Sequence, residues 1–93
     1  MTGRRLRIRS VDLRWEQLDD EVIILDLVGS TYLKLNGAGV VLWNALLDGA
    51  ARRDLVHTLL GEYDIDPPTA ERDVDAFLAK LSDAGLLETG EVR

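Results

Sequence analysis

The sequence predicts an α+β domain in which a three-stranded antiparallel sheet is followed by a three-helix bundle, a winged-helix-like order of elements. Residues 11–35 carry β-branched and alternating apolar residues separated by turn residues, which is typical of short strands joined by tight turns. Residues 36–88 instead repeat their apolar residues at helical spacing. A chain of 93 residues suffices for one domain with one modest core.

Three segments have the pattern of strands. Residues 11–17 alternate between apolar and charged side chains, residues 22–27 are rich in β-branched residues, and residues 31–35 alternate again. Residues 18–21 form the first turn, and Gly29 belongs to the second, whose two- or three-residue length leaves the strand register open. In such a meander, the third strand has one edge without a partner.

The three helices are predicted from their ends and their apolar stripes. The first follows Asn36, a suitable N-cap, and ends before Gly49. The second spans residues 54–63. The third begins after Asp66, whose side chain suits an N-cap, and ends before Gly85, after which the chain is expected to dock back onto the core.

The two chain ends are interpreted as extensions of this domain. Residues 1–10 alternate arginine with Leu6 and Ile8, a pattern that fits either an edge strand or a flexible arm. We interpret them as a loosely held, basic, extended arm, followed by the domain at residues 11–88 and a tail at residues 89–93.

Charge and composition exclude several classes of function. The net charge is −6, and 16 of the 17 acidic residues lie beyond residue 14, so the domain body should repel polyanions and favour cationic partners. The absence of cysteine excludes disulfides, thiolate zinc sites and a cysteine nucleophile. No apolar run approaches the roughly 20 residues of a membrane span, and no apolar segment follows the N-terminal arginines. We therefore expect a cytoplasmic protein without a membrane partner.

An ordered set of short motifs runs through nearly the whole domain: Leu25-Asp26-Leu27, Tyr32-Leu33-Lys34-Leu35-Asn36-Gly37, Gly39 with Leu42-Trp43, Asp73-Val74 with Phe77-Leu78 and Leu81, and Gly85-Leu86-Leu87. With these motifs, residues 11–88 resemble the PqqD-like family, named for coenzyme PQQ synthesis protein D. Its members are the peptide-recognition elements of ribosomal peptide natural-product pathways. The chain is most similar to the standalone leader-binding proteins of split lasso-peptide systems.

The resemblance implies a non-catalytic protein without a cofactor that binds the leader of a precursor peptide as an added strand. The leader would run along the third strand, in a groove between that strand and the third helix. The implied site residues are Thr31, Tyr32, Leu33, Lys34 and Leu35 on the strand, and Glu71, Asp75, Leu78, Ala79, Ser82 and Asp83 on the helix. The implied partners are a cysteine-protease-type leader peptidase and a macrolactam cyclase, with no nucleic acid, and the free protein would be a monomer.

Plainer interpretations exist for each of these features. The third strand fits an ordinary edge protected by Lys34, and the mixed helix row fits a solvated flank. Asp26 suits either a cap of the following turn or a contact to a basic leader residue, and we favour the cap. His57 has no second imidazole nearby in sequence, so we expect a surface histidine.

Two other functional classes compete with peptide binding. A winged-helix nucleic-acid-binding protein is the alternative, because the fold class permits it. The third helix, however, carries more acidic than basic residues, whereas phosphate contacts need clustered Lys and Arg. An enzyme would need a nucleophile with a positioned base, a metal cluster or a phosphate loop, and the sequence displays none of these patterns.

Overall fold

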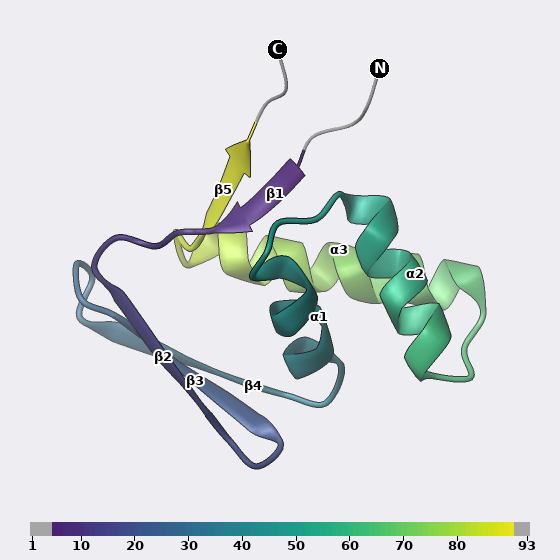
Figure 1. Cartoon of the computed structure of the whole chain (residues 1–93), viewed down its shortest axis with the longest axis horizontal. Coiled ribbons are helices and arrows are strands. Elements are labelled where there is room, and N and C mark those ends of the chain that lie inside the picture. Colours follow the sequence, from purple (N-terminus) through teal and green to yellow (C-terminus); the bar gives the residue numbers. More distant parts are fainter. Residues whose placement is uncertain (1–4, 91–93) are drawn as a thin grey trace.

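The computed structural model describes residues 5–90 and confirms the predicted fold class (Figure 1). A three-stranded antiparallel sheet, in the order β2-β3-β4, precedes three helices, and a second sheet pairs β1 with β5. The elements are β1 (Arg5–Ile8), β2 (Leu13–Leu18), β3 (Glu21–Asp26), β4 (Thr31–Asn36), α1 (Ala38–Leu46), α2 (Arg52–Glu62), α3 (Pro67–Asp83) and β5 (Leu87–Gly90).

The register of the three-stranded sheet decides which side chains enter the core. Ile24 of β3 lies opposite both Trp15 of β2 and Leu33 of β4, and Val22 lies opposite Leu35. These residues share one face because side chains alternate along a strand. Val22, Ile24 and Leu35 are buried, so this face packs on the helices.

The turns that connect these strands differ from the expected ones. Asp19 and Asp20 join β2 to β3, while a four-residue loop, residues 27–30, joins β3 to β4. The first strand also begins later than expected, because Asp12 has a positive φ of 54° and Val11 is 66% exposed. Residues 11–12 therefore lie outside β2, although the Asp12 carbonyl still accepts a hydrogen bond from the Leu27 amide.

The helices begin close to the expected positions, with one correction. Asn36 is the last residue of β4 and not an N-cap; Gly37, with φ 55°, precedes α1, and no side chain caps this helix. Helix α2 starts at Arg52, where the Asp54 carboxylate accepts a hydrogen bond from the Ala51 amide at 3.0 Å. The predicted cap of α3 is confirmed, since Asp66 accepts from the Thr69 amide at 3.1 Å.

The core lies between the sheet and the helices. Trp43 of α1 is fully buried at its centre, and its ring meets that of Trp15 edge to face, with the centroids 5.6 Å apart. Trp15 remains 41% exposed, so it covers the margin of the core. The largest fully buried side chains are Trp43, Ile24, Leu42, Leu46, Leu55, Leu59, Leu81, Leu86, Val22 and Val74.

The interpretation of the N-terminus as a loosely held arm is wrong for residues 5–8. These residues form β1, which pairs antiparallel with β5 from Arg5 opposite Gly90 to Ile8 opposite Leu87. Leu6 also exchanges backbone hydrogen bonds with Ala50, at 2.7 and 3.0 Å. Leu6 and Ile8 pack against the core, which explains why apolar residues alternate with the arginines. Residues 1–4 of the arm and 91–93 of the tail lie outside the described residues.

Candidate functional site

Strand β4 presents an open edge. Within residues 5–90, it pairs with β3 alone. The Leu27 amide donates to the Asp12 carbonyl at 3.0 Å, next to the start of β2. Because successive amides of a strand point to opposite sides, Leu25 and Ile23 also direct their amides toward β2. The residues between them, such as Ile24, therefore bond β4. It follows that Thr31, Leu33 and Leu35 bond to β3, whereas Tyr32 and Lys34 direct their amides and carbonyls to the free edge.

A hollow adjoins this edge on the core side of the sheet. It has a volume of about 40 Å³ and is lined by two residues of β3, three of β4 and two from the end of α3: Ile24, Asp26, Thr31, Tyr32, Leu33, Ala84 and Leu86. Unpaired backbone groups and an apolar recess thus meet at one place. This combination is what strand addition by a peptide needs, because the backbone supplies affinity and the recess selects side chains.

The sequence at the end of α3 forms one side of this hollow. The Gly85 amide donates to the Ser82 carbonyl at 3.0 Å, and the Leu86 amide donates to the Leu81 carbonyl at 2.9 Å. This pair of bonds is a Schellman motif, and Gly85 has the positive φ, 75°, that the motif requires. The motif reverses the chain and buries Leu86, as expected, which leaves Ala84 beside β4.

The structure places two of the predicted helix residues on the side of α3 that faces α2. Arg52 of α2 donates to both carboxylate oxygens of Asp75, at 2.7 and 2.9 Å. The hydrogen bond to Asp75 and the nearby charge of Glu71 both raise the pKa of Arg52. The same bond lowers the pKa of Asp75. None of the six predicted helix residues lines the hollow beside β4.

Helical spacing explains this outcome. Glu71, Asp75, Leu78 and Ser82 follow one another at i, i+4, i+7 and i+11, so they share one flank of α3. Leu78 is half-buried against the core, whereas Ala79, Ser82 and Asp83 are exposed. Ala84 lies on the opposite flank, which the same spacing extends back through Asp73, Phe77 and Lys80. The six predicted helix residues therefore lie away from the hollow beside β4, and their role in peptide binding stays a prediction.

Asp26 has the structural role that we favoured. One of its carboxylate oxygens accepts from the Val28 amide at 3.0 Å and from the Gly29 amide at 3.2 Å, so it caps the loop between β3 and β4. The same oxygen accepts from the Arg9 guanidinium, and this hydrogen bond is the main reason why the pKa of Asp26 lies below its ordinary value of 3.8. The carboxylate is therefore ionised at neutral pH.

A larger hollow lies elsewhere, on the face of the sheet that points away from the helices. Its volume is about 310 Å³, and Arg14, Trp15, Glu16, Ile23 and Leu25 line it. It is a broad surface depression over β2 and β3, distant from the free backbone groups of β4. We therefore place the candidate peptide site at the smaller hollow, where the backbone and the recess coincide.

Nothing in the described part of the chain forms a metal centre. Among residues 5–90, no three His, Cys, Asp or Glu side chains gather as they would around a metal ion. His57 is exposed on α2, as expected. No helix within the same residues combines the length and apolar character of a membrane span.

Comparison with known proteins identifies the family. Residues 21–87 match the family model of coenzyme PQQ synthesis protein D (PqqD). The chain belongs to the PqqD family. None of the curated proteins matches it.

Two solved structures of similar proteins contain peptides. TbiB1, in complex with the TbiA(beta) leader peptide, is 36% identical to this PqqD family member and superimposes with a TM-score of 0.81, covering 94% of this chain and 99% of TbiB1. A lasso peptide synthetase B1, complexed with the leader peptide, is 29% identical, with a TM-score of 0.78 and coverage of 89% of this chain and 96% of the synthetase.

Proposed function

We propose that this PqqD family member binds the leader peptide of a ribosomally made precursor, in the biosynthesis of a lasso peptide. Both similar solved structures contain a leader peptide, and their likeness to this chain extends over nearly the whole domain. The observation that carries the proposal is the free edge of β4 beside the hollow closed by Ala84 and Leu86. The leader adds to β4 as a further strand and bonds the outward groups of Tyr32 and Lys34.

The leader's second contact is with α3. In our proposal, the flank that carries Ala84, Lys80, Phe77 and Asp73 borders the peptide, in place of the acidic row of Glu71, Asp75 and Asp83. Ala84 is the smallest of these side chains and lines the hollow, so it leaves room for a leader side chain. This flank carries one acidic residue, Asp73, and one basic residue, Lys80, so its charge gives no reason to expect a basic peptide.

The protein acts without chemistry of its own. It holds the leader while the attached core peptide reaches a cysteine-protease-type leader peptidase and a macrolactam cyclase. Tethering raises the effective concentration of the core peptide at those enzymes, and this needs no catalytic group on the binding module. A nucleic-acid-binding function gains no support from the described charges, since acidic residues outnumber basic ones on α3.

Calorimetric titration with a synthetic leader tests the proposal, the leader being that of a short precursor reading frame found by sequencing around the gene of this chain. The parent protein should bind the leader, but not a scrambled peptide of the same composition. Ala84→Leu fills the hollow and should lower affinity about tenfold or more, equivalent to at least about 1.4 kcal/mol.

Ala79→Leu is the matched control, because Ala79 is an exposed alanine of the same helix on the predicted row. It should bind like the parent. If Ala79→Leu weakens binding and Ala84→Leu does not, the leader lies on the originally predicted row. If the parent binds neither peptide, or both equally, leader recognition itself is wrong.

A further inference from the structure

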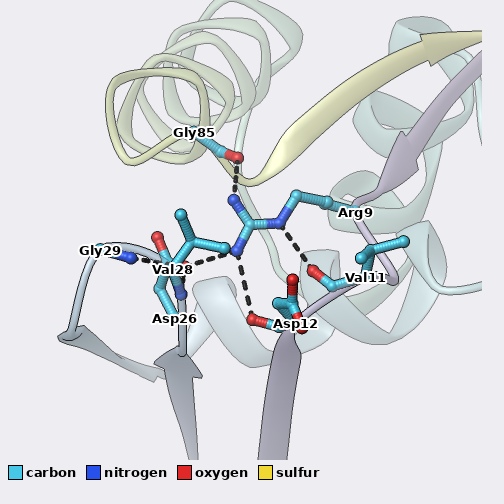
Figure 2. A network of polar contacts seen from close by, with 7 residues as sticks. All are labelled: Arg9, Val11, Asp12, Asp26, Val28, Gly29 and Gly85. Atoms are coloured by element: carbon cyan, nitrogen blue, oxygen red, sulfur yellow. Dashed lines mark hydrogen bonds and ion pairs between the residues drawn. The ribbon is translucent and has the colours of Figure 1, made fainter.

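Arg9 joins three segments that are far apart in the sequence (Figure 2). It lies in the link between β1 and β2. Its Nε donates to the Val11 carbonyl at 3.1 Å, and its Nη1 donates to the Gly85 carbonyl at 3.0 Å. Its Nη2 pairs with the Asp26 carboxylate at 2.5 Å and also lies 3.5 Å from the Asp12 carbonyl.

The two distant partners of Arg9 stand on opposite sides of the proposed peptide groove. Asp26 ends β3 and lines the hollow, and Gly85 directly follows Ala84, which lines it from the α3 side. One rigid guanidinium fork therefore spans from the sheet to the helix end. Because a planar guanidinium has fixed donor directions, it sets the distance between the two acceptors.

The Asp26 end of this bridge also orders the β3–β4 loop. The oxygen that accepts from Arg9 is the one that accepts from the Val28 and Gly29 amides. A Cβ on Gly29 would lie 3.1 Å from the other Asp26 oxygen, so the loop closes tightly on the carboxylate. The loop leads directly into Thr31, where the exposed edge of β4 begins.

We propose that Arg9 is a positioning residue for peptide binding, which fixes the width of the groove between β4 and the end of α3. The proposal rests on the function proposed above. Arg9 is not a direct ligand, because four of its five N–H donors bond Val11, Gly85, Asp26 and Asp12, and its side chain is only 20% exposed. The basic N-terminal segment thereby acquires a defined task that its sequence pattern did not reveal.

The Arg52–Asp75 pair offers a matched comparison. It also links α3 to another element through a guanidinium and a carboxylate, but it lies on the flank that faces α2. Its side chains are 45% and 59% exposed, and neither lines the hollow. Removing Arg52 therefore removes an ion pair from α3 without touching the groove.

The test compares Arg9→Gln with Arg52→Gln by thermal melting and by titration with the synthetic leader. Arg9→Gln should lower leader affinity about tenfold or more at a temperature where it is fully folded, while Arg52→Gln stays within about twofold of the parent. Asp26→Asn, alone and combined with Arg9→Gln, completes a double-mutant cycle. The two changes should be non-additive in leader affinity, because both remove the same bridge.

Several results would overturn the proposal. If the Arg9→Gln variant binds the leader as tightly as the parent does, the proposal is wrong. It is also wrong if the Arg9 and Arg52 variants both lose affinity in proportion to their loss of melting temperature. Should Arg9→Gln fail to fold, Arg9→Lys is judged by the same criteria, since lysine keeps the charge but lacks the fork. A parent protein that ignores the leader refutes the proposed function instead, so the two failures are distinguishable.

Discussion

The outer strands of the three-stranded sheet, β2 and β4, each pair only with β3 in the described part of the chain, yet their surroundings differ. Three consecutive residues of β4 line a hollow whose far side is the end of α3. Beside β2, a hollow of about 190 Å³ is lined mostly by residues from outside the strand: Ile8, Arg9, Ser10 and Leu47, with Leu13 and Trp15 from β2.

This difference distinguishes a strand edge that is only unpaired from one that can also select a particular peptide. Unpaired backbone groups attract any extended chain and carry no selectivity. A second wall from another element adds side-chain pockets along the same path, and β4 has this wall in Ala84 and Leu86. The hollow beside β2 reaches only Leu13 and Trp15 at the start of the strand, and Leu18 at the other end is 49% exposed, so we expect no selective strand addition there.

Leu33→Pro should have the largest effect on the protein. The Leu33 amide bonds β3, and proline has no amide hydrogen, so the hairpin loses a ladder bond at its centre. The substitution also removes a side chain that packs against the core. We expect the free energy of unfolding to fall by about 3 kcal/mol or more. A thermal melt checks this, and a melting temperature close to that of the parent would show that the assigned bond parity of β4 is reversed.

Lys34→Pro should separate binding from stability. The Lys34 amide points to the free edge, where proline is tolerated, so the fold should remain stable to within about 1 kcal/mol. Leader affinity should fall about tenfold, because one hydrogen bond is lost and the ring crowds the incoming strand.

Gln17→Pro is the matched control on the other edge. By the same parity, the Gln17 amide of β2 points away from β3, so its loss of stability should equal that of Lys34→Pro, and its leader affinity should match that of the parent. Calorimetric titration of both variants decides. If Gln17→Pro weakened leader binding and Lys34→Pro did not, the leader would bind at β2 and not at β4.

The contrast between the two edges was only partly predictable from the sequence. Alternation in residues 31–35 and the meander order were enough to identify β4 as an edge strand. Asp66 and Gly85 likewise marked the ends of α3, because caps depend on local backbone chemistry. Each of these features is settled within a few residues of chain.

The remaining features depend on contacts between distant segments. The flank of α3 that borders β4 follows from the way the helix packs on α2, and both flanks carry plausible residues around the same buried stripe. The pairing of β1 with β5 joins the two ends of the chain, and the four-residue segment of β5 has little strand character of its own. Arg9 donates a hydrogen bond to Gly85, 76 residues away, and no local sequence pattern indicates such a bond.

The smallest expected effect lies in the turns that precede each hairpin's second strand. Ser30, before β4, and Asp19, before β3, adopt left-handed conformations with φ of 56° and 54°. Aspartate tolerates this region better than serine, because its short carboxylate bonds the local backbone. Ser30→Gly should therefore stabilise the protein by about 0.5 kcal/mol, the strain relief being partly offset by the greater freedom of glycine in the unfolded chain. Asp19→Gly should gain less stability than Ser30→Gly, or lose stability.

Chemical denaturation of both variants measures the difference. Leader affinity should be unchanged in Ser30→Gly, because the loop keeps its length and therefore the register of β4. A gain in Asp19→Gly that exceeds that of Ser30→Gly would mean that the loop before β4 holds Ser30 without strain.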